Sequence, residues 1–142
     1  YAAMALAMVT KDSAGTSKFL TKLYSDAKNE EDVRRGALFG LGLVGDRQSV
    51  GFLLQALQDK KNNDFTRGAA AVALGLIRDG RSLQNVIKLA QDNNSDRQTR
   101  GFAIAALGYM VDSDPVPAAS RLFARNNFRT EFNSLKVLMQ NL

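Results

Sequence analysis

The sequence contains no cysteine, no histidine and no tryptophan, and it has only two prolines among its 142 residues. The lack of cysteine excludes disulfide bonds and thiolate chemistry, and it leaves the redox compartment open. The lack of histidine excludes most zinc sites as well as Ser/His and Cys/His catalysis. No run approaches the roughly 18 consecutive apolar residues that a membrane-spanning helix needs. We therefore expect no metal site, no cofactor, no catalytic residues and no membrane span.

The composition is that of an ordinary globular domain, with 45% hydrophobic residues, 23% charged residues and a net charge of +5. A chain of this length folds as one domain with a core large enough for stability. The net charge is modest, so it permits an anionic partner without requiring one. Because Tyr1 already lies inside a repeat helix of the pattern described next, we expect the chain to be the C-terminal part of a longer protein.

A unit of 33 residues recurs along the chain. The segments 34–42, 67–75 and 100–108 align without gaps, and each begins with Arg and ends with Leu-Gly. The Ala-rich start at 1–9 fits the same pattern if its following turn is about two residues longer. A second apolar helix is expected in each unit, at 16–26, 49–59, 82–92 and 115–125, with polar turns between the helices. Periods of about 20 to 50 residues are typical of solenoids.

We therefore predict an all-α fold, an α–α superhelix that forms a right-handed helical-repeat solenoid of about four repeats. The single domain spans 1–142, with units near 1–30, 31–63, 64–95 and 96–128. Residues 129–142 break the pattern, and their apolar side chains share one helical face: Phe132, Leu135, Met139 and Leu142. This spacing predicts a C-terminal capping helix, which covers the last open core of a solenoid.

The order of sequence features within each unit resembles the HEAT-like repeats of the phycobilisome-lyase type. Val-Arg precedes an Ala-rich helix that ends in Ala-Leu-Gly, and Gly-Asp then leads into an amphipathic helix that ends in Leu-x-Asp; residues 32–34 and 41–46 match best. The resemblance implies that the Ala-rich helices line the concave side, as inner helices, and that the amphipathic helices lie outside. It also implies that Arg and Asp positions form hydrogen bonds between repeats.

The inner helices lack a polar face. Over 36–44, 68–77 and 101–111 the only polar side-chain atom is the hydroxyl of Tyr109. One face is explained by packing on the outer helices, and the opposite face carries what we call the apolar ladder: Met4, Met8, Phe39, Leu43, Val72, Leu76, Phe102 and Tyr109. Large exposed apolar patches mark interfaces, so we expect the ladder to line a partner-binding groove. Two alternatives remain: a second copy or another part of the chain covers the ladder, or the ladder is core.

Seven of the eleven glycines lie inside the inner helices, where each costs about 1 kcal/mol relative to alanine. Gly42, Gly75 and Gly108 recur at one position of the repeat. We interpret them as sites of close helix–helix approach, since no phosphate-binding loop pattern is present.

Charged residues also recur in rows. Arg34, Arg67 and Arg100 open the inner helices, and together with Arg35 they are candidates for anion contacts. We favour a structural role, with the arginines paired to the acids that lie just before them: Asp32, Asp64 and Asp96. A second acidic row follows in the next turns: Asp46, Asp79 and Asp112.

These features favour a non-enzymatic scaffold that binds a protein or peptide with an apolar segment, with a homo-oligomer as one form of cover for the ladder. The first alternative is nucleic-acid or other anion binding through the arginine row and a C-terminal basic cluster, Arg121, Arg125 and Arg129. It is disfavoured because the chain lacks the strong basic stripe typical of such proteins. The second alternative, a bilin-lyase-like accessory activity, is implied only by the resemblance.

Overall fold

The computed structural model describes residues 2–26 and 30–111, and within these ranges the chain forms only helices and turns. The α-helices are α1 (Ala2–Val9), α2 (Ser13–Ser25), α3 (Glu31–Val44), α4 (Val50–Gln58), α5 (Asp64–Ile77), α6 (Leu83–Gln91) and α7 (Arg97–Val111). Short 3-10 turns, η1 (Arg47–Ser49) and η2 (Gly80–Ser82), lead into α4 and α6. The prediction of an all-α helical-repeat solenoid is confirmed.

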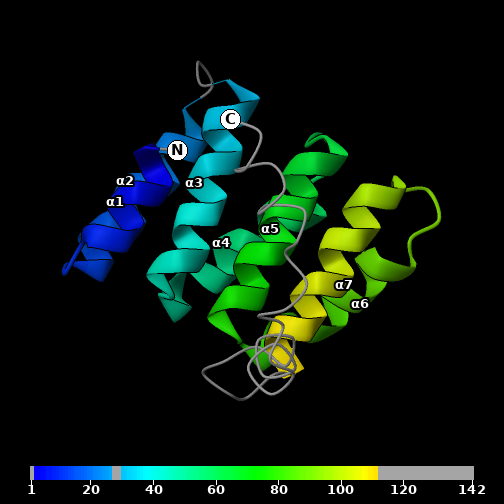
Figure 1. Cartoon of the computed structure of the whole chain (residues 1–142). Coiled ribbons are helices and arrows are strands. Elements are labelled where there is room, and N and C mark those ends of the chain that lie inside the picture. Colours follow the sequence, from blue (N-terminus) through cyan, green and yellow to red (C-terminus); the bar gives the residue numbers. More distant parts are fainter. Residues whose placement is uncertain (1, 27–29, 112–142) are drawn as a thin grey trace, which may run out of the picture. The chain divides into compact units, whose positions relative to one another are not determined.

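The helices form two layers. Figure 1 shows the inner helices α3, α5 and α7 side by side, with α4 and α6 behind them. Helix α1 extends the inner layer by packing on α3, and α2 belongs to the outer layer. Each outer helix packs most extensively on the inner helix that follows it, so the pairs are α2 with α3, α4 with α5 and α6 with α7. The backbones of neighbouring outer helices lie further apart, and these helices meet through side chains such as Tyr24 of α2 and Phe52 of α4.

Glycine sets the short spacing of the inner layer. A Cβ atom at Gly42 would lie 2.6 Å from Cα of Ala73, and one at Gly75 would lie 2.8 Å from Cα of Ala106. No side chain fits at these distances, so the predicted close approach is confirmed at both positions. At Gly108, the third glycine of the row, an added Cβ atom would have no described atom within 4 Å beyond the neighbouring backbone.

Side-chain caps mark the starts of α5 and α7. Asn63 Oδ1 accepts a hydrogen bond of 2.8 Å from the backbone N–H of Thr66, and Asp96 Oδ1 accepts one of 2.6 Å from that of Thr99. These caps satisfy N–H groups that lack a partner within the helix. All three inner helices begin three residues before the arginines at which the repeat pattern starts, and α3 does so without a side-chain cap. Helices α3 and α5 end on left-handed residues, Gly45 and Arg78.

The core lies between the two layers. Its largest fully buried side chains are leucines from both layers: Leu20, Leu38, Leu41, Leu53 and Leu74. The expected helix at 115–125, the C-terminal basic cluster, the capping helix and Asp112 lie outside the described residues.

Candidate functional site

All eight residues of the apolar ladder remain at least partly accessible to solvent. Met8 is 75% exposed and Leu43 is 41% exposed, whereas the other six are partly buried. On the opposite face of the same helices, Leu41 and Leu74 are completely buried. The inner helices therefore have one face in the core and one that reaches solvent.

An aromatic pair lies on the inner layer next to the ladder. The ring centroids of Phe65 in α5 and Phe102 in α7 are 6.3 Å apart, with 63° between the ring planes. Phe102 lies over Gly68, where a Cβ atom would come within 2.7 Å of its ring. The Arg35 guanidinium of α3 lies 5.5 Å from the centroid of Phe65, so residues of three successive inner helices meet here. Such cation–π contacts are weakly stabilising at exposed sites.

The sequence analysis missed Phe65, which is 39% exposed. It lies seven residues before Val72 and therefore on the same helical face. This seven-residue spacing could have revealed Phe65, but the repeat pattern placed the start of the helix at Arg67, after Phe65. The Asn63 cap extends the helix backwards and brings Phe65 into line with the ladder.

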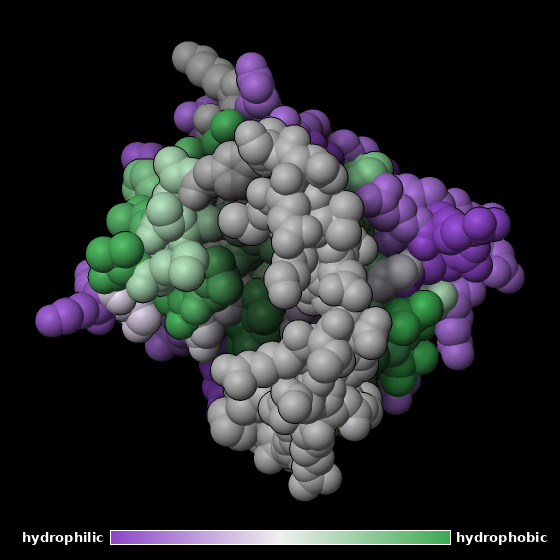
Figure 2. Space-filling model, viewed as in Figure 1, coloured by the Kyte–Doolittle hydropathy of each residue, from purple (hydrophilic) through white to green (hydrophobic). Residues whose placement is uncertain are grey.

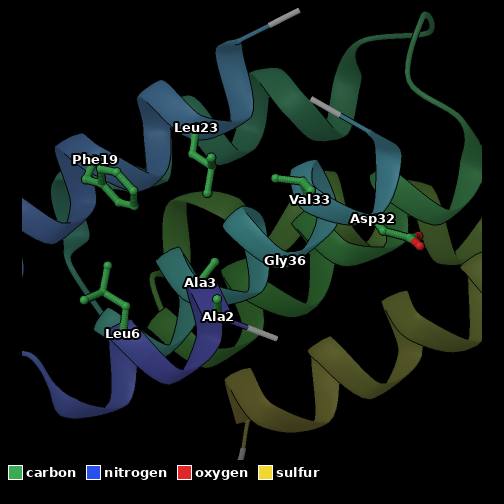
Figure 3. A pocket seen from close by; sticks show the side chains of 8 residues that line it. All are labelled: Ala2, Ala3, Leu6, Phe19, Leu23, Asp32, Val33 and Gly36. Atoms are coloured by element: carbon green, nitrogen blue, oxygen red, sulfur yellow. The ribbon is translucent and has the colours of Figure 1, made fainter. Parts of the chain in front are cut away.

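A second apolar surface lies at the end of the stack that begins with α1. Its side chains enclose a hollow of about 480 Å³ between α1, α2 and α3, which we call the end groove. Figure 3 shows side chains of all three helices around it, and the apolar lining consists of Ala2, Ala3, Leu6, Phe19, Leu23 and Val33. Figure 2 shows hydrophobic residues gathered on the same side of the molecule, over α1 and α3.

The end groove was not expected from the sequence. Phe19 is 52% exposed, Leu6 is 42% exposed and Val33 is 37% exposed. Asp32 is the only charged residue of the lining, and it forms an ion pair with Arg35. The groove is thus almost wholly apolar.

Arg34 and Arg67 form equivalent hydrogen bonds between repeats. Arg34 donates to Asn62 Oδ1 at 3.0 Å, and Arg67 donates to Ser95 Oγ at 3.2 Å. Each acceptor lies 28 residues after its arginine, in the turn that follows the next outer helix. These bonds are of the kind that the resemblance implies.

Arg34 and Arg67 each have further partners within the same chain. Arg34 also pairs with Glu31 at 3.2 Å and stacks over the Tyr24 ring at 4.6 Å. Arg67 pairs with Asp64 at 3.3 Å and donates to the carbonyl oxygen of Leu57 at 3.1 Å.

The pairing differs in part from the expected one. Asp64 does pair with Arg67, but Asp32 pairs with Arg35 in place of Arg34. Asp96 caps α7, and Arg100 donates to Asn93 Oδ1 at 3.3 Å. An anion would have to compete with these partners for the guanidinium groups.

The second acidic row caps the 3-10 turns. Asp46 accepts from the backbone N–H of Gln48 at 2.9 Å, and Asp79 accepts from that of Arg81 at 3.0 Å. The Arg81 side chain also donates twice to Asp79 at 2.8 Å, and it reaches the carbonyl oxygen of Arg47 in the preceding repeat at 3.3 Å. These bonds from Arg81 lower the pKa of Asp79 from 3.8 to about 2.

The turn before α7 carries a similar acid. The pKa of Asp92 is lowered mainly because the backbone N–H of Asn94 donates to its carboxylate, with a further hydrogen bond from the Ser95 hydroxyl. Its weaker ion pair with Arg67, at 3.8 Å, acts in the same direction.

No described part of the chain shows the chemistry of a metal site or a membrane span. Across residues 2–26 and 30–111, no three His, Cys, Asp or Glu side chains are grouped so that they could hold a metal ion. In the same ranges, no helix has the length and apolar character needed to cross a bilayer.

A family model of HEAT repeats matches residues 16–99, just over half of the 142 residues. The chain belongs to the HEAT-repeat family. HEAT repeats generally serve as scaffolds for protein interactions, and they are typically not enzymes. No curated protein matches the sequence. The phycobilisome-lyase subtype of these HEAT repeats stays a prediction.

Proposed function

We propose that this HEAT-repeat chain is a non-enzymatic scaffold that binds an apolar segment of a protein or peptide along its inner face. The observation that carries the proposal is the run of partly accessible apolar residues on three successive inner helices. These residues are Phe39 and Leu43 of α3, Val72 and Leu76 of α5, and Phe102 and Tyr109 of α7, and Phe65 adds to them.

The energetics of such a face favour an apolar partner. Burying one fully exposed large apolar side chain contributes about 1.5–3 kcal/mol, so burial of the accessible parts of the ladder favours an apolar partner. Aromatic residues are enriched at interfaces, and the Phe65–Phe102 pair lies in the first turns of α5 and α7, beside the rest of the ladder. The hydrogen bonds of Arg34 and Arg67 within the protein count against the alternative that anions bind there.

The test uses the full chain and two ladder variants, Leu43→Asp and Leu76→Asp. Ile87→Asp is the matched control, because Ile87 is partly accessible but lies on the outer helix α6. Displayed random peptides are selected on the wild-type chain, and their affinities for the four proteins are measured. We expect apolar peptides that bind both ladder variants at least about tenfold more weakly, since tenfold corresponds to about 1.4 kcal/mol.

Circular dichroism and thermal melting check that the ladder variants stay folded. Equal peptide binding by all four proteins would contradict the proposal. Selected ligands whose affinity falls steeply with salt would favour the anion alternative. A wild-type dimer that Leu43→Asp dissociates, in sedimentation experiments, would show that a second copy covers the ladder.

A further inference from the structure

The arginines at the two ends of the inner helices differ in their contacts. At the ends where the helices begin, Arg34 and Arg67 are held by hydrogen bonds and ion pairs within the chain. At the other ends lie Arg47, in the 3-10 turn after α3, and Arg78, which caps α5. Both are exposed, and within residues 2–26 and 30–111 neither guanidinium group forms a hydrogen bond or an ion pair. We call these two residues the basic edge.

Arg78 has a strained backbone. Its φ angle is 57°, and among the described residues it is the only one other than glycine with a positive φ. The same position of the preceding unit is Gly45, with a φ of 73°. The left-handed conformation is costly for a residue with a side chain, whereas glycine adopts it freely. Because Gly45 ends α3 in the same way, the turn itself does not need an arginine, and a strained residue of this kind indicates a role outside the fold.

The basic edge lies next to the apolar ladder. Arg78 follows Leu76 by two residues, and Arg47 follows Leu43 by four. Consecutive Cα atoms are about 3.8 Å apart, so the Cα atoms of Arg78 and Leu76 are separated by no more than about 7.6 Å. The Arg81 side chain joins the two turns, because it donates to the carbonyl oxygen of Arg47 at 3.3 Å. A segment bound on the ladder therefore passes close to both arginines of the basic edge.

The acidic residues of the same turns have other partners. Asp46 accepts a hydrogen bond of 2.9 Å from a backbone N–H of its own turn, and Asp79 pairs with Arg81 at 2.8 Å. These turns hold three arginines, Arg47, Arg78 and Arg81, against two aspartates, which leaves one positive charge in excess. The charge at the basic edge thus complements a carboxylate from outside the chain.

We propose that the apolar segment bound along the ladder carries an Asp or Glu side chain beside its apolar residues, and that this carboxylate pairs with Arg78, with Arg47 as a second contact. The inference rests on the proposed function and adds the charge of the partner to it. A guanidinium group and a carboxylate match each other in charge and in geometry, since two parallel hydrogen bonds can form. The pair also sets the direction of the segment, whose acidic residue lies where α3 and α5 end.

The test starts from random peptides selected on the wild-type chain, with the peptide C-terminus fused to the display protein so that every carboxylate comes from Asp or Glu. The tightest ligand is synthesised in two forms, one as selected and one with Asn and Gln in place of Asp and Glu. Fluorescence anisotropy gives the affinity of both forms for the full chain. We expect the acidic form to bind at least about threefold more tightly, as one exposed ion pair allows.

Two variants locate the ion pair. Arg78→Gly should remove the preference for the acidic form, and its thermal midpoint should be no lower than that of the wild type, because glycine relieves the backbone strain. The matched control is Arg97→Gln, which removes the same charge from an exposed arginine at the start of α7. The control should keep the preference for the acidic form.

Equal affinities of the two peptide forms for the wild type would overturn the inference, as would a preference that both variants reduce equally, since only net charge would then matter. An Arg78→Gly variant that melts at a lower temperature and keeps the full preference would show that Arg78 serves the C-terminal end of α5 instead. Leu43→Asp separates the two proposals. If it weakens both peptide forms and these bind the wild type equally, the proposed function stands and this inference fails. If it weakens neither, or if no peptide is selected, both fail.

Discussion

The inner helices α3, α5 and α7 have 14, 14 and 15 residues and lie close together. The outer helices α4 and α6 have only 9 residues each, and their backbones lie further apart. Both layers come from one repeat, so the difference arises within each unit. The inner helices carry glycine at the points of contact, and Gly42 and Gly75 allow the next backbone to approach. The outer helices fill the core with larger side chains such as Leu53 and Val86.

The inner and outer helices therefore have different roles. Close packing holds the inner helices at fixed positions, and their other face is left partly accessible along the ladder. The outer helices cover the core, and the turns that follow them accept the hydrogen bonds that join one repeat to the next. Changes in the two layers should therefore have effects of different size and kind.

The largest expected effect comes from the inner layer, in Gly75→Val. The new Cβ atom would lie 2.8 Å from both Cα and the carbonyl oxygen of Ala106, which belong to the backbone of α7. Overpacking of this kind costs about 3 kcal/mol, and a contact with backbone leaves little room for relief. Urea denaturation should therefore show a free energy of unfolding lower by about this amount or more.

The matched change in the outer layer is Gly51→Val in α4, where no described atom beyond the neighbouring backbone lies within 4 Å of the new Cβ position. We expect the free energy of unfolding to change by no more than about 0.5 kcal/mol, as is usual at exposed positions. Similar losses in both variants would contradict the assignment of close packing to the inner layer alone.

A smaller effect is expected from Asn62→Ala, which removes a link between the layers. Asn62 is 5% exposed, and its side chain joins Tyr24 of α2, the carbonyl oxygen of Ala56 in α4 and Arg34 of α3. Loss of these partners leaves buried polar groups without hydrogen bonds, so the variant should lose about 2 kcal/mol of stability.

Thermal and urea unfolding measure this loss. Lys61→Ala, in the same turn but exposed, is the control and should stay within about 0.5 kcal/mol of the wild type. An Asn62→Ala variant as stable as the control would show that water replaces the lost partners.

The smallest effect is a pH dependence in the turn between α5 and α6. The hydrogen bonds from Arg81 lower the pKa of Asp79 to about 2, so the charged carboxylate stabilises the folded state. This contribution is fully present above the unfolded pKa of about 4, and it is lost as the pH falls through the folded value. Asp79→Asn removes it, so the stability of the two proteins should converge between about pH 4 and pH 2.

The measurement is urea unfolding of both proteins at several pH values in this range. The effect should be small because the Arg81 side chain is 67% exposed, and solvent screens such a pair. A stability difference that does not depend on pH would mean that the Asp79 cap acts through its shape and not through its charge.

The repeat, the all-α class and the close approach at Gly42 and Gly75 could all be predicted from the sequence. The residues that carry these features recur every 33 residues. Such residues can be recognised in the sequence because each copy packs against the same kind of neighbour. The apolar ladder was visible for the same reason, since a helix with no polar face reveals its second apolar face by spacing alone. Phe65 was missed because the repeat pattern starts at Arg67, whereas α5 begins three residues earlier, after the Asn63 cap.

Which of two equivalent residues is buried could not be predicted, because it depends on how the helices pack. Leu6 and Leu41 occupy the same position of the repeat, but Leu41 is completely buried and Leu6 is 42% exposed. The partners of Arg34 and Arg67 were likewise fixed by the stacking of one repeat on the next. The physical reason is that the burial and the hydrogen bonds of a residue depend on the contacts between adjoining repeats. The residue type alone does not determine these contacts.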